Sequence, residues 1–117
     1  MNLNKDESWE TETLVVLVTA PSAEAQALAT KLLEAKLIAC ANILPSVLSI
    51  YSWKGETAVD QESLLVMKTR SEIYAQLEAK IKELHSYEVP EILAVSVDRG
   101  SKAYLDWVKE SLSKVGN

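Results

Sequence analysis

The stretch that most constrains the fold is residues 38–70, which have the pattern of one long antiparallel hairpin. Two runs rich in β-branched, aromatic and aliphatic residues, 47–53 and 63–69, flank a short turn at 54–57. Gly55 supplies the positive φ that a tight reversal needs. We expect the rest of the chain to pack on this hairpin or to extend its sheet.

Both faces of this hairpin are apolar. Along the first arm Leu48 and Ile50 fall on one face, while Tyr51 and Trp53 fall on the other. A small antiparallel sheet usually wets one face, so this pattern predicts burial on both sides, by helices on one and by another subunit on the other. Pro45 donates no ladder hydrogen bond and therefore predicts an edge, a bulge or a bend in the first arm.

The remaining elements follow from hydrophobic period and capping signals. They are a strand at 14–18, a helix from the cap Ser22 to near Lys36, a helix from the cap Ser71 to Leu84, a strand at 92–97 and a last helix capped by Ser101. The order predicts an α+β fold: a ferredoxin-like βαββαβ sandwich with an extra C-terminal helix. Right-handed crossovers give an antiparallel four-stranded sheet with both long helices on one face.

The composition indicates one ordinary globular domain, which we place at 14–117 behind a mobile acidic tail at 1–13. The net charge of −5, with arginine only at positions 70 and 99, argues against a nucleic-acid partner. The single cysteine cannot form an internal disulfide, and no signal-like segment is apparent, so a cytoplasmic location is expected. No apolar run approaches the length of a bilayer span, so no membrane role is expected.

Catalytic signatures are absent from the sequence: it has no glycine-rich phosphate loop and no CxxC, HExxH or GxSxG motif. Cys40 and His85 lack a local third group that would orient them as a nucleophile pair, and Cys40 is more simply interpreted as a small buried residue. His85 follows a predicted helix C-terminus, where an imidazolium is stabilised by the helix dipole. Its alternative role is a metal ligand or ligand contact beside Tyr87, Glu88 and Glu91. We therefore expect no enzyme.

Four further residues gather in the predicted hairpin: Tyr51, Trp53, Glu62 and Lys68. In the simpler interpretation the aromatic rings fill a subunit interface and the charges pair across strands. In the alternative they line a cleft between subunits.

Several collinear motifs resemble one known family. They are VVLVTAP at 15–21, AKLIACANILP at 35–45, SIYSWKGE at 49–56, ESLLVMKT at 62–69, YEVPEI at 87–92 and YLDWV at 104–108. The chain resembles the CutA divalent-cation-tolerance family over about 14–112. The resemblance implies a ferredoxin-like homotrimer with no established catalytic activity, which responds to copper and other divalent metal ions and binds a metal ion or a small molecule in clefts between subunits.

The family's copper ligands carry over only in part. The cysteine that follows VVL in copper-binding members corresponds to Val18, and the first of two adjacent histidines corresponds to Leu84. His85 matches the second histidine, and Cys40 matches the cysteine of the ACA motif. The resemblance therefore implies that Cu(II) or another divalent cation is bound weakly, through His85 and Cys40. The candidates for lining the cleft are Tyr51, Trp53, Glu62, Lys68, Tyr87, Glu88 and Glu91.

Two alternatives share this fold. A small-molecule-sensing regulatory trimer that resembles the PII proteins would prefer a basic, glycine-rich phosphate contact, which the sequence lacks. A small ferredoxin-like enzyme such as an acylphosphatase would need arginine and asparagine in the loop after the first strand. Residues 19–22 there contain neither.

Overall fold

A computed structural model describes residues 12–112. Residues 1–11 of the predicted tail and the last five residues of the predicted domain, 113–117, lie outside the described residues. The elements in chain order are β1 (Thr13–Ala20), α2 (Ser22–Glu34), β2 (Cys40–Trp53), β3 (Glu56–Arg70), the 3-10 turn η1 (Ser71–Ile73), α3 (Tyr74–Leu84), β4 (Ile92–Ser96) and α4 (Lys102–Leu112).

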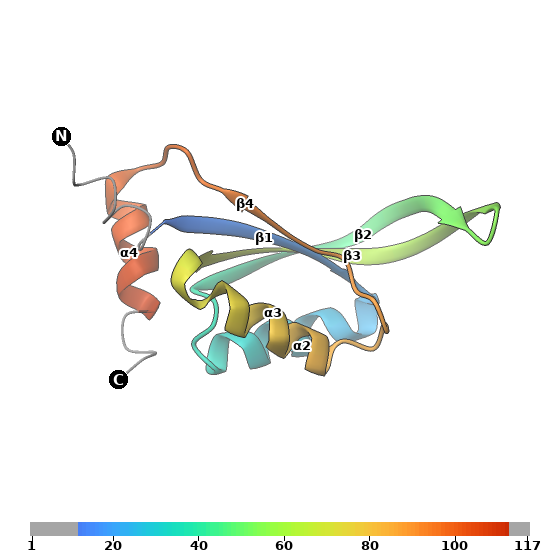
Figure 1. The fold of residues 1–117 in the computed structure, drawn as a ribbon, viewed down its shortest axis with the longest axis horizontal. Coiled ribbons are helices and arrows are strands. Elements are labelled where there is room, and N and C mark those ends of the chain that lie inside the picture. Colours follow the sequence, from blue (N-terminus) through green and yellow to red (C-terminus); the bar gives the residue numbers. More distant parts are fainter. Residues whose placement is uncertain (1–11, 113–117) are drawn as a thin grey trace.

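The four strands form one antiparallel sheet in the order β2-β3-β1-β4. Helices α2 and α3 both cover one face of it, and α4 lies at the end opposite the hairpin tip (Figure 1). This arrangement confirms the predicted ferredoxin-like fold with an added helix. No helix within residues 12–112 is long and apolar enough to cross a bilayer.

The core lies between the sheet and the two helices, and it follows from the two hydrophobic periods in the sequence. Every second residue of β1 from Leu14 to Ala20 is buried, as a strand with one face on helices requires. Helix α2 meets them with residues spaced by three and four: Ala25, Leu28, Ala29 and Leu32. Each fully buried Leu or Ile of this layer contributes about 1.5–3 kcal/mol of transfer free energy.

The hairpin of β2 and β3 is longer than the sequence predicted, at 14 and 15 residues. Its register shifts between Leu44 and Val47, so Pro45 lies at a bulge, as its missing N–H predicted. Strand β1 ends at Ala20, opposite Ser63, and beyond that point the two arms pair only with each other. The distal half of the hairpin therefore projects from the domain (Figure 1), whose extents are 52 × 29 × 23 Å.

The sheet face away from the helices is apolar and exposed in the single chain. Large hydrophobic side chains with about half or more of their surface in contact with solvent lie on this face or on the projecting arms: Leu44, Leu48, Ile50, Val59, Leu93 and Val95. An isolated two-stranded ribbon is marginally stable in water, and exposed apolar patches mark interaction surfaces. Both features make this surface a candidate interface.

Two of the three predicted serine caps are wrong. Pro21 is the N-cap of α2, and Ser22 lies inside the helix, where its hydroxyl accepts a hydrogen bond from Ser63 at 3.0 Å. Ser71 opens η1, and α3 starts after Ile73 without a side-chain cap. Ser101 does cap α4, because its Oγ accepts from the Tyr104 N–H at 3.4 Å.

Helix α2 ends near Lys36, as predicted, in a paired C-terminal motif. The Leu37 N–H donates to the Leu32 carbonyl and the Lys36 N–H donates to the Leu33 carbonyl, both at 3.0 Å. Lys36 has φ 63°, the left-handed conformation that glycine adopts without steric cost.

We expect Lys36→Gly to raise the free energy of unfolding by about 1 kcal/mol, because it relieves the left-handed strain. Gly55→Ala is the matched change of opposite sign: Gly55 has φ 81°, and an added Cβ there meets no atom within 4 Å, so only backbone strain enters. Urea denaturation at one protein concentration measures both. An unchanged or lowered stability in Lys36→Gly contradicts the assignment of the motif.

Candidate functional site

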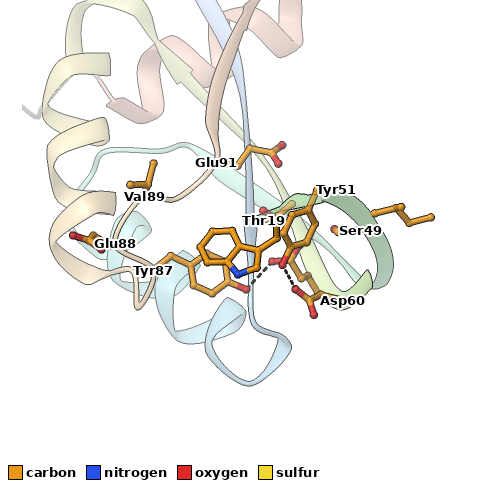
Figure 2. A pocket seen from close by; sticks show the side chains of 11 residues that line it. Thr19, Ser49, Tyr51, Asp60, Tyr87, Glu88, Val89 and Glu91 are labelled. Atoms are coloured by element: carbon orange, nitrogen blue, oxygen red, sulfur yellow. Dashed lines mark hydrogen bonds between the residues drawn. The ribbon is translucent and has the colours of Figure 1, made fainter. Parts of the chain in front are cut away.

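A pocket of about 680 Å³ lies where the hairpin leaves the sheet. Three segments line it: the end of β1, the distal half of the hairpin and the loop between α3 and β4 (Figure 2). The lining residues are Thr19, Ser49, Ile50, Tyr51, Trp53, Asp60, Glu62, Tyr87, Glu88, Val89 and Glu91. Four of these carry carboxylates, three carry aromatic rings and none carries a basic side chain.

The bulge at Pro45 decides which hairpin side chains face this pocket. Before the bulge Leu44 pairs with Leu64, whereas after it Val47 pairs with Glu62 and Ser49 pairs with Asp60. Across the bulge β2 therefore moves forward by three residues while β3 moves by two. As a result, every later β2 side chain lies on the opposite sheet face from the one that an unbroken register would give it. The odd-numbered side chains of β2, including those of the two aromatic residues, are thereby placed beside the acidic side chains of β3.

Glu62 is the most deeply buried acid in the pocket, with 6% of its surface exposed. Its Oε2 accepts a hydrogen bond of 2.7 Å from the Tyr87 hydroxyl. Burial, followed by this carboxylate, raises the pKa of Tyr87 to about 12, so the phenol stays protonated and donates at neutral pH. Within residues 12–112 no lysine, arginine or histidine forms an ion pair with Glu62. Glu62 therefore combines burial and a single tyrosine donor with the absence of a basic partner among these residues, which makes it the first candidate in the pocket for contact with a cation.

A second tyrosine–carboxylate pair stands beside the first. The Tyr51 hydroxyl donates to Asp60 Oδ2, and this hydrogen bond is the main reason that the pKa of Tyr51 is raised. Figure 2 shows Tyr51, Asp60 and Tyr87 close together, while Glu88 and Glu91 lie farther out. The pocket therefore combines two carboxyl groups that each accept a hydrogen bond from a tyrosine, and Glu88 and Glu91 add two more carboxyl groups.

His85 holds the loop of the pocket in place. Its Nε2 donates to the Thr19 carbonyl at 2.8 Å, and its Nδ1 accepts from the Tyr87 N–H at 3.1 Å. A carbonyl only accepts and an N–H only donates, so this geometry fixes the neutral Nε2–H tautomer. The ring is 8% exposed and packs on Tyr87 with 4.7 Å between centroids. Metal ligation by His85 requires the loss of one of these two hydrogen bonds.

Cys40 lies in a different part of the molecule. It is the first residue of β2, and its Sγ is 3.4 Å from the Tyr104 hydroxyl of α4. The register places Cys40 opposite Lys68, and Lys68 opposite Val15, whereas His85 bonds to Thr19. Four strand residues separate these levels, about 13 Å at 3.3 Å per residue. Among residues 12–112 no three His, Cys, Asp or Glu side chains group as a metal site. The structure does not bring Cys40 and His85 together.

Six of the seven residues predicted for the cleft line the pocket, and Lys68 does not, since it lies farther along β3 with its ammonium on Asn42. Sequence reasoning missed five lining residues: Thr19 in β1, Ser49, Ile50 and Asp60 in the hairpin, and Val89 in the loop before β4. Alternation was the available signal for Asp60, because it lies two residues before Glu62 and so shares its face. Thr19 lines the pocket only because the sheet brings the end of β1 beside the hairpin, and no local sequence pattern predicts this.

Comparison with known proteins identifies the family. The CutA1 divalent ion tolerance protein family matches residues 14–111. A relative named divalent-cation tolerance protein CutA, from Thermus thermophilus, is 47% identical over 98 residues, which cover 83% of this chain and 95% of the relative. The relative named protein CutA, chloroplastic, from Arabidopsis thaliana is 39% identical over 112 residues, which cover 94% of this chain but 62% of the plant protein.

Solved structures agree with the sequence match. The Cut A1 divalent cation tolerance protein of Thermus thermophilus superposes with a TM-score of 0.82 at 46% identity, over 85% of this chain and 97% of that one. A structure described as the PII-like protein CutA of Nostoc, in apo form, gives a TM-score of 0.80 at 36% identity, over 85% of this chain and 96% of that one.

Proposed function

Because the chain belongs to the CutA1 divalent ion tolerance family, we propose that it is a non-catalytic protein that binds a cation in the pocket around Glu62 and acts in the response to divalent ions. The observation that carries the proposal is the buried Glu62 carboxylate, which has a tyrosine donor but no cation among the described residues. A bound cation would supply the missing charge. The cytoplasm is the proposed compartment, from the single Cys40.

The family name implies a divalent ion, and the residues present fit such an ion only in part. Cys40 and His85 do not form a donor set, because they lie apart and both ring nitrogens of His85 are already bonded. The pocket offers carboxylate oxygens, which hard cations prefer, but no grouped set of them. We therefore propose weak divalent binding through Glu62 and Asp60 rather than a closed copper site at His85.

We propose further that the working molecule is a homotrimer. The apolar sheet face and the projecting hairpin expose large hydrophobic side chains to solvent. Further copies of the chain carry the same apolar surfaces and can bury them by packing against them. The pocket lies at the base of the hairpin, so it borders the surface that assembly would cover. This supports the prediction of a cleft between subunits.

A second candidate is a regulatory small-molecule sensor, and the volume of the pocket favours it. About 680 Å³ falls in the usual range for small-molecule sites, about 300–1,000 Å³. No basic residue is among those that line the pocket, so a phosphate-bearing ligand is disfavoured. The two candidate functions use the same pocket. They differ in its occupant, which is a divalent metal ion in the first and a small organic molecule in the second.

Calorimetric titration with MnCl₂ and, separately, with CuCl₂ tests the proposal. We expect Glu62→Gln to weaken binding about 10–100-fold, since a hydrogen-bonded charged contact contributes about 1.5–3 kcal/mol. Glu34→Gln, which removes the same charge from the exposed end of α2, is the control and should leave affinity unchanged, as should Cys40→Ser. If Cys40→Ser abolishes binding and Glu62→Gln does not alter it, the site is at the thiol and the proposal is wrong.

A further inference from the structure

The donor atoms and the volume of the pocket suit a ligand larger than a bare metal ion. A divalent cation such as Ca²⁺ collects six to eight oxygens within about 2.6 Å, or keeps its own water. Within the described chain no three acidic, histidine or cysteine side chains are grouped for this, and Asp60 and Glu62 each accept a hydrogen bond from a tyrosine. The pocket has a volume of about 680 Å³ and is open to solvent, so it has room for a molecule larger than a single ion. Size and donor arrangement both indicate a molecular ligand.

The acidic side chains of the pocket favour a ligand with positive charge. Asp60 lies beside Tyr51 and Tyr87, and Glu62 accepts from the Tyr87 hydroxyl. Glu88 and Glu91 lie farther out, and within residues 12–112 no basic side chain lines the pocket. The acidic character does not stand alone, because the Glu62 carboxylate is more than nine-tenths buried and has no cationic partner within residues 12–112. One of its oxygens accepts from Tyr87, which leaves the other for an N–H donor. Charge-assisted hydrogen bonds of this kind are the strong ones.

The aromatic rings of the pocket indicate which other groups the ligand carries. Tyr51, Trp53 and Tyr87 supply π faces that attract an ammonium group and pack against methylene groups. Trp53 already attracts a cation of the chain itself, since the Lys54 ammonium stands 5.5 Å from its ring centroid. An alkyl chain with an ammonium at each end matches a pocket that is lined by both carboxyl groups and aromatic rings.

We propose, resting on the cation-binding function above, that the preferred ligand of this pocket is a small aliphatic diamine or polyamine. One ammonium group donates to Glu62 and Asp60, the methylene chain lies against the aromatic rings, and the second ammonium group meets Glu88 or Glu91. The tyrosine hydroxyls hold the carboxylates of Glu62 and Asp60 in place for this contact. A quaternary ammonium ion would make the cation–π contacts with the aromatic rings, but it has no N–H group and would donate no hydrogen bond to Glu62.

Calorimetric titration of the full-length protein with putrescine, in a buffer free of amines and metals, tests this inference. We expect saturable binding at one site per chain, weakened at least 10-fold by Glu62→Gln and left unchanged by Glu34→Gln. Trp53→Leu should weaken it several-fold while the far-ultraviolet spectrum stays unchanged. Uncharged 1,4-butanediol, of matched length, should not bind, and tetramethylammonium should bind more weakly than putrescine.

The outcomes separate this inference from the function on which it rests. If MnCl₂ binds in a Glu62-dependent way and putrescine does not bind, the diamine is wrong and the cation pocket stands. If tetramethylammonium binds more tightly than putrescine, the ligand is a quaternary ammonium compound and the inference is overturned. If Glu62→Gln and Glu34→Gln weaken putrescine equally, the binding is diffuse surface attraction, and the inference fails. If neither cation binds wild type, the proposed function fails with it.

Discussion

Val66→Asp is expected to prevent assembly of the proposed trimer and to lower the cooperativity of folding with it. Val66 lies in the middle of β3, between Leu17 of β1 and Asn42 of β2, on the sheet face that the helices leave open. A subunit packed on that face would bury the new carboxylate without a partner, at a cost of several kcal/mol. Sedimentation equilibrium and thermal unfolding at matched concentrations measure the two effects.

Ile50→Asp separates assembly from folding. Ile50 is 65% exposed in the single chain and lies on the projecting arm, away from the buried core. Its substitution should therefore spare the fold of the domain while it impairs association. Gln26→Glu, which adds the same charge at an exposed position of α2, should assemble as the wild-type protein does. A wild-type chain that sediments as a folded monomer at micromolar concentration would show that the exposed apolar face needs no second copy.

The second large effect is expected at His85. His85→Ala should lower the free energy of unfolding by about 1–3 kcal/mol, because it leaves the half-buried Thr19 carbonyl without its donor and the Tyr87 N–H without its acceptor. His85→Gln should lose less, since its Nε2 amide can donate to the same carbonyl. Urea denaturation at one protein concentration ranks the three proteins.

His85→Ala also discriminates between a positioning role and the metal-ligand role that the family resemblance implied. A positioning residue gives a stability loss that the glutamine variant partly restores, with Mn²⁺ affinity altered mainly through the loosened Tyr87. If His85→Ala keeps wild-type stability but loses all affinity for Cu²⁺, the imidazole is a metal ligand and its two hydrogen bonds to Thr19 and Tyr87 are not both kept in the working state.

The fold was predictable because its signals are local and repeated. Gly55, the alternation around the turn and the helical spacing of Ala25, Leu28 and Leu32 each specify an element without reference to the rest of the chain. The length of the hairpin was not predictable, since residues 56–62 are largely polar and pair only because β2 lies beside them. Two serine caps failed because Pro21 displaced one and η1 displaced the other.

The site was predictable only where its residues lie in the hairpin and the following loop. Tyr51, Trp53 and Glu62 were found because a two-sided apolar hairpin with charges at its exit is unusual. The role of His85 was not readable, because its partner is a main-chain carbonyl 66 residues away. The resemblance pointed to Cys40 by motif, and the strand register then separated it from His85. Side-chain type gives candidates, and the register decides which of them meet.

The carboxyl ¹³C resonance of Glu62 tests the central claim, that this buried acid contacts the bound cation, most directly. The protein is labelled in its glutamate carboxyl groups, the resonance is assigned by its loss in Glu62→Gln, and a cation that binds by calorimetry is titrated in. We predict a saturable shift of the Glu62 resonance with the calorimetric Kd, while the Glu34 resonance stays in place. A Glu62 resonance that does not move while the cation binds would contradict the account.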